Sequence, residues 1–122
     1  MDQRIPPKFQ QYDHHKVEKA FSIVQTMRVK KHIFNPSHRT IWTVVGYEGD
    51  QFVDPLQPYC SCSDFHYNVL GGKNPICYHL LSVQISKSIR KYEHVIFDDQ
   101  EYAFFIKALI NDITSKKKKH KG

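Results

Sequence analysis

Two short stretches of this sequence decide its fold: Tyr59-Cys60-Ser61-Cys62 and Ile76-Cys77-Tyr78-His79. Each stretch places two metal-binding side chains two positions apart, and fourteen residues separate Cys62 from Cys77. Thiolate sulfur and imidazole nitrogen are the usual donors of structural zinc sites, which take four ligands in a tetrahedron. We therefore predict one structural Zn²⁺ bound by Cys60, Cys62, Cys77 and His79.

The second pair needs a particular local geometry. On a continuous helix, Cys77 and His79 would point about 200° apart. We expect Cys77 at a cap position just outside a helix, where free N–H groups and the helix dipole stabilise a thiolate. His66, four residues after Cys62, is an alternative fourth ligand. His79 is preferred because it belongs to the same local unit as Cys77.

Other roles for the three cysteines fit less well. Their number is odd, and a disulfide between Cys60 and Cys62 would be strained. No Cys-x-x-Cys redox motif is present. The remaining alternative is that the cysteines are small buried hydrophobic residues that share this spacing by chance.

Outward from the cysteines, the patterns predict an α+β fold with a small antiparallel β-sheet, the zinc site at a strand-to-helix connection, and about three helices. Residues 1–12 are expected to be a flexible arm, residues 13–114 a single domain with a finger core at 41–90, and residues 115–122 a basic tail. The first predicted element is a helix over residues 14–29, capped by Asp13, although residues 28–34 can also be read as a strand. Two strands, over 41–47 and 51–53, follow and are joined by a turn at 48–50. A second helix begins at about Cys77, and a third runs from Asp98 or Asp99 to about Ile113.

The net charge of +6 is concentrated at one end of the chain. Outside the tail, 13 Lys and Arg stand against 12 Asp and Glu. The high pI is therefore weak evidence for a basic surface on the folded body. The five remaining positive charges belong to Lys116, Lys117, Lys118, Lys119 and Lys121.

Two groups of basic residues are candidates for contact with nucleic acid. The first is Arg28, Lys30, Lys31 and Arg39, near the aromatic Trp42; on a strand, Arg28, Lys30 and His32 would share one face. The second is Lys116, Lys117, Lys118 and Lys119 of the tail, which would follow a phosphate backbone. The alternatives are a solvated sheet face and a solubilising tail.

The predicted third helix also offers a surface for a protein partner. Most of its apolar residues fall on one stripe, which should pack on the domain. Phe104 lies off that stripe, which would suit a partner surface; burial in the core is the alternative.

The stretch Tyr59-Cys60-Ser61-Cys62-Ser63-Asp64-Phe65, followed by Ile76-Cys77-Tyr78-His79-Leu80-Leu81-Ser82-Val83, resembles a SWIM-type zinc finger. The resemblance covers roughly residues 28–90 and implies the same four ligands. Tyr78 stands where the family often places a basic residue. Because the chain is short, it looks most similar to the small stand-alone SWIM-domain proteins. That resemblance implies a binding module in recombination or repair whose partner is a RecA-family recombinase paralog.

The sequence favours binding over catalysis. Four protein ligands leave a zinc ion no open position for water, and the deaminase arrangement His-x-Glu…Cys-x-x-Cys is absent. We predict a non-enzymatic module that contacts nucleic acid, a DNA-processing protein or both, with no small-molecule substrate. The alternatives are a protein-interaction adaptor without nucleic-acid contact and, third, a zinc-dependent hydrolase. Without an apolar span or signal segment, a cytoplasmic protein is expected, or a nuclear one in a eukaryote.

Overall fold

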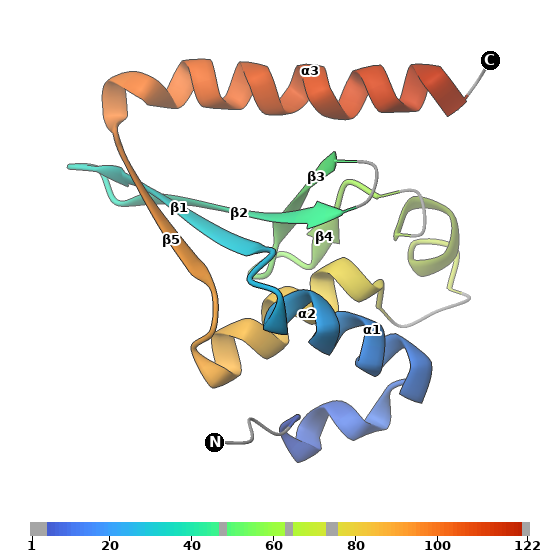
Figure 1. Cartoon of the computed structure of the whole chain (residues 1–122). Coiled ribbons are helices and arrows are strands. Elements are labelled where there is room, and N and C mark those ends of the chain that lie inside the picture. Colours follow the sequence, from blue (N-terminus) through green and yellow to red (C-terminus); the bar gives the residue numbers. More distant parts are fainter. Residues whose placement is uncertain (1–4, 47–48, 63–64, 73–75, 121–122) are drawn as a thin grey trace.

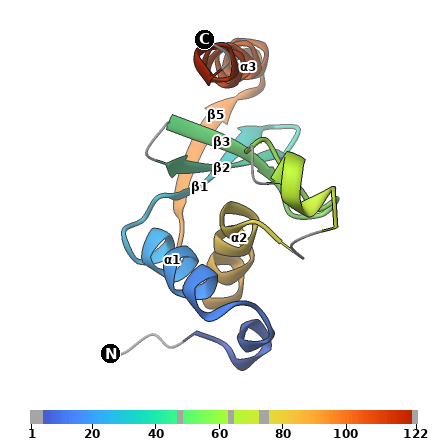
Figure 2. The same cartoon turned by 90° about the vertical axis from the view of Figure 1, so that its right-hand side faces the viewer.

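The computed structural model describes residues 5–46, 49–62, 65–72 and 76–120. Its centre is a five-stranded sheet in the order β4-β3-β2-β1-β5, with α1 and α2 on one face and α3 across the other, as Figures 1 and 2 show. The strands are β1 (Val29–Asn35), β2 (Arg39–Gly46), β3 (Gly49–Asp54), β4 (Tyr59–Cys60) and β5 (Glu93–Asp98). The helices are η1 (Pro7–Gln11), α1 (His14–Gln25), η2 (Phe65–Val69), α2 (Tyr78–Ile89), η3 (Asp99–Glu101) and α3 (Tyr102–His120).

The predicted α+β class is confirmed, but the sheet is mixed rather than purely antiparallel. Strands β1 to β4 pair antiparallel, whereas β5 lies parallel to β1. Residues 93–98 were not among the predicted strands. This segment is largely exposed, so it lacks the run of buried apolar residues that identifies an interior strand. Its place in the sheet depends on pairing with β1, which is distant in the sequence.

Helix α1 begins as predicted and ends earlier. The Asp13 carboxylate accepts a hydrogen bond from the Lys16 backbone N–H at 3.1 Å, which caps the first turn. The helix stops at Gln25, and Met27 adopts a positive φ of 58°. Residues from Val29 onward join the sheet, so the strand alternative for this region is the correct one.

The region predicted to be a flexible arm contributes to the core. Its described part, residues 5–12, contains the 3-10 helix η1. Phe9 of η1 is 4% exposed and packs in the same cluster as the buried faces of α1 and α2. This one large apolar side chain ties the segment to the domain.

The main core lies between the sheet and the two helices α1 and α2. Helix α2 contributes Leu80, Leu81, Val83 and Ile85, all no more than 2% exposed. The three cysteines belong to the same cluster. The packing of α2 against the sheet is therefore continuous with the packing around the sulfur atoms.

A second, smaller core lies between the sheet and α3. Phe34 of β1 is fully buried there, with its ring centroid 5.2 Å from that of Phe97, 5.0 Å from Tyr102 and 5.4 Å from Phe105. The start of α3 is fixed by a capping box in which Asp98 and Glu101 satisfy each other's backbone N–H groups. The helix continues to His120, beyond its predicted end near Ile113.

His32 of β1 is a polar residue inside this second core. Its Nε2 lies 2.9 Å from Oγ1 of Thr43, and its Nδ1 is buried without a hydrogen-bond partner. The ring also lies against Phe97 and Phe105. Burial lowers the pKa of His32 to about 4, and the nearby Lys30 charge acts in the same direction. The imidazole is therefore neutral in the folded protein near neutral pH.

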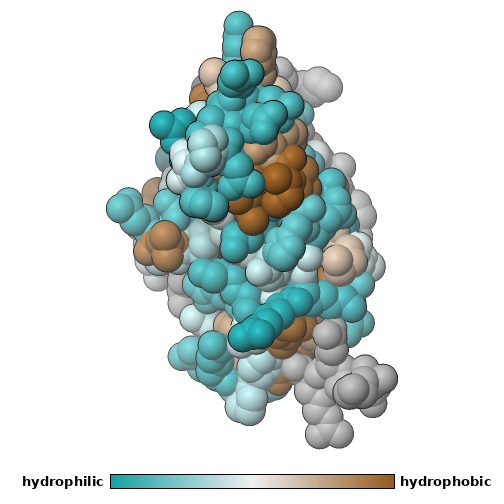
Figure 3. Space-filling view, turned by 90° about the vertical axis from the view of Figure 1, so that its left-hand side faces the viewer, coloured by the Kyte–Doolittle hydropathy of each residue, from teal (hydrophilic) through white to brown (hydrophobic). Residues whose placement is uncertain are grey.

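One side of the molecule is mostly polar at its surface. Figure 3 shows this side, which is largely hydrophilic with a compact hydrophobic area. Large exposed apolar residues include Ile96 on β5 and Phe104 and Ile110 on α3. In the part of the chain that the structure describes, none of the helices combines the length and the apolar character needed to cross a membrane.

The second core predicts a clear contrast between two phenylalanines. Phe34→Ala should lower the free energy of unfolding by about 3–5 kcal/mol, because it leaves a cavity under α3. Phe104→Ala, on a side chain that is 79% exposed, should change it by less than about 0.5 kcal/mol. Urea denaturation of both zinc-loaded variants measures the difference. Equal effects would show that α3 does not pack on the sheet.

His32 predicts a specific acid sensitivity. The unfolded chain binds a proton at this residue below a pKa of about 6.5, whereas the folded chain does so only near pH 4. Stability should therefore fall by about 1–2 kcal/mol from this residue alone as the pH drops from about 6.5 to about 5. Unfolding measured against pH should show a smaller decline in His32→Leu than in wild type. The control, His15→Ala at an exposed position, should keep the wild-type decline; an unchanged decline in His32→Leu would contradict the assignment.

Candidate metal centre

The first ligand pair stands where the short strand β4 ends. Cys60 pairs with Val53 of β3, and both Cys60 and Cys62 are buried. Ser61 between them extends the strand pairing: its N–H donates to the Phe52 carbonyl at 2.9 Å, and its Oγ accepts from the Phe52 N–H at 2.9 Å. The same hydroxyl lies 2.7 Å from Oε1 of Gln51, to which it donates. These bonds hold the Cys-x-Cys segment against β3.

The second pair stands at the start of α2, in the predicted arrangement. Cys77 is the N-cap residue, with extended backbone angles, and its Sγ accepts from the Leu80 N–H at 3.4 Å. His79 lies in the first turn of the helix. Because Cys77 is outside the helix, its side chain and that of His79 can reach the same point. The Lys16 ammonium of α1 donates to the Ile76 carbonyl at 2.6 Å, which fixes the approach to this turn.

The four predicted ligands meet in one buried cluster. One donor atom from each of Cys60, Cys62, Cys77 and His79 lies within 4.8 Å of the other three. All four residues are buried, and the cysteines form no disulfide. His66 remains outside this cluster and is exposed. The structure thus brings together the ligand set that the sequence favoured.

The orientation of the His79 ring leaves one nitrogen available. A Cβ atom placed on Gly46 would lie 3.5 Å from Nε2, so that nitrogen is turned toward the β2 backbone. Nδ1 is buried and has no hydrogen-bond partner. A buried imidazole nitrogen without a partner is costly, and binding a metal ion removes that cost. Nδ1 is therefore the donor that fits the ion.

The sulfur atoms also require a cation. Hydrogen bonding with Cys62 raises the pKa of Cys60, and the same bond lowers the pKa of Cys62. A hydrogen bond with Cys60 lowers the pKa of Cys77, but interaction with Cys62 and burial outweigh it and raise that pKa to about 12. The three sulfurs alone can share one negative charge, and a second or third thiolate in this interior needs a positive ion. Three thiolates and one imidazole fit Zn²⁺ in a closed, structural site.

The basic residues predicted from the sequence do not form one surface. Arg28 precedes β1, where its Nε donates to Thr26 Oγ1 at 2.9 Å. Lys30 and Lys31 lie on opposite faces of the sheet, because successive strand residues alternate. Lys31 is over the Trp42 ring at 5.5 Å, and Arg39 is over the Tyr102 ring at 4.6 Å.

Lys30 and His32 lie on the same face of β1, as predicted for a strand, but α3 covers the His32 side chain, so this face is not a continuous exposed surface. In the tail, the helical backbone of α3 includes residues 116–119, but their side chains lie outside the described part of the chain, as does Lys121. Phe104 is 79% exposed, as expected for a residue off the packed stripe.

Some residues that hold the ligands in place carry no signal of this role in the sequence. Ser61 is one of them: its hydroxyl completes the strand pairing between the two cysteines and β3. Lys19 of α1 places its ammonium 4.0 Å from the centroid of the Tyr78 ring. A cation therefore lies beside position 78 even though the residue there is not basic. The contact between Lys19 and Tyr78 is not detectable without knowing that α1 packs beside α2.

The geometry predicts that the two histidines respond differently to substitution. His79→Ala should abolish stoichiometric zinc binding and destabilise the segment from 60 to 90, because zinc affinity of about 10–16 kcal/mol is coupled to folding in small zinc domains. His66→Ala should keep one zinc per chain. Elemental analysis measures the zinc content of each purified variant. Zinc retained in His79→Ala would refute the assignment of His79 as a ligand.

Chelation tests the same site without a substitution. Removal of zinc should raise hydrogen exchange in β4 and the first turn of α2, whose ligands are released. The amides of Phe34 and its neighbours in β1, on the other side of the molecule, should respond least. Exchange that is unchanged throughout residues 60–90 would show that the fold does not depend on the ion.

Comparison with known proteins agrees with this geometry. Residues 42–87 match the SWIM zinc finger family. The chain is 29% identical over 85 residues to a zinc finger SWIM domain-containing protein 7 homolog of Dictyostelium discoideum, covering 68% of this chain and 54% of that protein. It is 32% identical over 78 residues to an uncharacterized protein of Archaeoglobus fulgidus, covering 64% of this chain and 59% of that one.

The chain therefore spans somewhat more than half the length of these two relatives. No solved structure matches it significantly. The matched segment contains most of β2, all of β3 and β4, both ligand pairs and most of α2. Residues 42–87 are therefore similar to the SWIM zinc finger family, and the buried four-ligand cluster lies within this matched segment.

Proposed function

We propose that this protein is a zinc-stabilised binding module that contacts nucleic acid, a DNA-processing protein partner, or both. One observation carries the proposal: the metal cluster is buried and has four protein donors. Such a site holds β4 to α2 and leaves no position for a metal-bound water. A zinc-dependent hydrolase would need that open position. Contact with other molecules is therefore made by the surface around the site.

Cationic side chains on aromatic rings support contact with nucleic acid. Lys31 Nζ is 5.5 Å from the Trp42 centroid and 5.8 Å from that of Tyr92. Arg39 lies over Tyr102. Surfaces that combine positive charge with aromatic rings suit phosphates and bases at the same time. The basic C-terminal residues would add affinity that does not depend on sequence.

The protein partner proposed is a RecA-family recombinase paralog, in recombination or repair. Support for this partner comes from the resemblance to small stand-alone SWIM-domain proteins, which is an analogy at the level of the family. The exposed Phe104 and Ile110 on α3 favour a second candidate function, an adaptor that contacts proteins alone. Under that alternative, Phe104→Asp should abolish binding of the protein to a purified RecA-family recombinase paralog while leaving its zinc content unchanged.

Salt-dependent binding tests the proposed function. Zinc-loaded protein should bind labelled DNA or RNA oligonucleotides with an affinity that falls steeply between about 50 and about 200 mM salt. Removal of residues 116–122 should reduce the slope, because fewer phosphates are neutralised. Fluorescence anisotropy measures both quantities. No association at the lowest salt concentration would leave only the protein-adaptor function.

A further inference from the structure

Two neighbouring cavities share two lining residues on the face where the sheet ends meet α2. The first has a volume of about 450 Å³, and its lining includes Lys8, Tyr12, Pro55, Gln84, Lys87 and Ser88. The second has a volume of about 480 Å³ and lies between α2, the sheet and α3. Both are lined by Pro55 and Lys87, so these two residues mark where the cavities join. We call the combined hollow the Lys87 groove.

The second half of the groove occupies a notch in the sheet. Strand β3 ends at Asp54, whereas β2 begins at Arg39, so the first residues of β2 have no partner from β3. Thr40, Trp42 and Lys31 line this notch, and Tyr102 lines it from α3. The groove therefore runs from η1, past α2 and the sheet end, to the start of α3.

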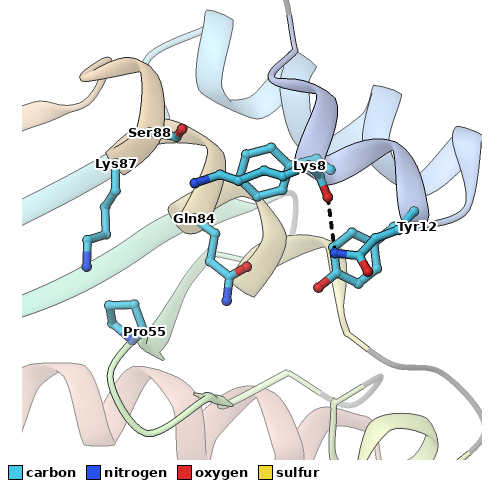
Figure 4. A pocket seen from close by; sticks show the side chains of 8 residues that line it. Lys8, Tyr12, Pro55, Gln84, Lys87 and Ser88 are labelled. Atoms are coloured by element: carbon cyan, nitrogen blue, oxygen red, sulfur yellow. Dashed lines mark hydrogen bonds between the residues drawn. The ribbon is translucent and has the colours of Figure 1, made fainter.

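The groove has a positive character. Lys8, Lys31 and Lys87 line it, and none of them forms an ion pair with a described residue. Asp54 also lines the second cavity, but its Oδ1 accepts hydrogen bonds from the N–H groups of Leu56 and Gln57. Figure 4 shows the first cavity, with Lys87 and Gln84 extending from α2 toward Pro55 and with Lys8 and Tyr12 across from them.

The shape and the other lining groups indicate what would fit. Each cavity lies within the roughly 300–1,000 Å³ that holds a small ligand, which is enough for a nucleotide. Gln84 and Ser88 provide hydrogen-bonding groups that a base or sugar can use. Tyr12 and Tyr102 are half-buried and present ring surface, and the Arg39 guanidinium lies over Tyr102 at the far end. Lysines with interspersed aromatic rings in a concave channel are typical of sites for single strands.

We propose that the Lys87 groove binds a short stretch of single-stranded nucleic acid, with Lys8, Lys31 and Lys87 facing its phosphates. This inference rests on the proposed nucleic-acid function and specifies the surface and the form of the ligand. A single strand can enter a hollow and place bases against its walls. Duplex DNA is read instead by elements that protrude into its grooves. An acidic peptide would use the lysines but has no need of the aromatic rings and amides.

The groove also depends on the zinc site. Its shared wall, Pro55, belongs to the turn that leads from β3 to the ligand strand β4. Zinc bound at Cys60 and Cys62 fixes the end of that turn. Loss of the ion should therefore weaken single-strand binding even though no ligand of the ion lines the groove.

Charge reversal in the groove tests the proposal against a matched control. The probe is a fluorescent oligothymidine, titrated with zinc-loaded full-length protein. One phosphate contact contributes about 0.7 to the logarithmic salt slope of a single strand, or about fivefold in affinity at about 0.1 M salt. Lys87→Glu and Lys8→Glu should each weaken binding by at least that factor and reduce the slope. Lys107→Glu, at an exposed position of α3 that lines neither cavity, makes the same charge change and should have a smaller effect.

The outcomes separate the groove from the broader function. If wild-type protein binds neither oligothymidine nor duplex DNA, both the proposed groove and the proposed contact with nucleic acid are overturned. Binding that responds equally to Lys87→Glu and Lys107→Glu would overturn the groove and leave nucleic-acid binding in place. An equal loss of duplex binding would overturn the preference for single strands, and stronger competition by polyglutamate than by oligothymidine would identify an acidic peptide as the ligand.

A second measurement does not depend on the variants. Photo-crosslinking of 4-thiothymidine oligonucleotides to wild-type protein should label peptides that contain Tyr12, Lys87 or Tyr102. Labels confined to the peptides of α1 and to the outer side of α3 around Lys107 would place the strand elsewhere. Zinc content and circular dichroism of each variant confirm that the fold is retained.

Discussion

Three cysteine sulfurs and one imidazole nitrogen converge in the interior of this protein, and the rest of the structure depends on a cation that makes their convergence favourable. The sulfurs can share a single negative charge through hydrogen bonds, but three thiolates in a buried space repel one another. Zn²⁺ supplies the opposing charge and a preferred tetrahedral geometry. The strand end at Cys60 and the helix start at Cys77 are thereby joined, although a loop separates them in sequence.

The consequences extend into the main core. The cysteines pack among the apolar residues of α1, α2 and the sheet, so metal binding and hydrophobic burial are parts of one cluster. Ser61 and Lys16 hold the two ligand segments through hydrogen bonds to backbone carbonyls. The core under α3 is separate and holds the neutral His32 among aromatic rings. One side of the sheet is thus stabilised by the metal site and the main core, and the other by aromatic and aliphatic side chains packed under α3.

Because the two cores cover the two faces of the sheet, the ends of the strands remain available for contact with other molecules. The zinc ion is enclosed, so it does not contact other molecules directly. In the proposed function, the ion contributes by fixing the turn between β3 and β4, whose Pro55 lines both cavities of the Lys87 groove. The lysines of that groove come from η1, β1 and α2, elements that only the folded chain brings together. A small domain with a structural metal can therefore still present a concave binding surface, because the ion holds the segments that form its walls.

The ligand set could be predicted from the sequence because sulfur and imidazole at short spacings have few other uses in a reducing environment. The cap position of Cys77 could be predicted because helix geometry separates residues two apart. Most helices and strands could be predicted from the spacing of their apolar residues, because each of them buries one face. Strand β5 did not, because its residues are largely exposed and its position depends on β1. Lys30 and Lys31 are adjacent in sequence, but strand alternation places them on opposite faces of the sheet. Local chemistry therefore determined the metal site and the class of fold, whereas long-range pairing and packing decided which lysines share a groove.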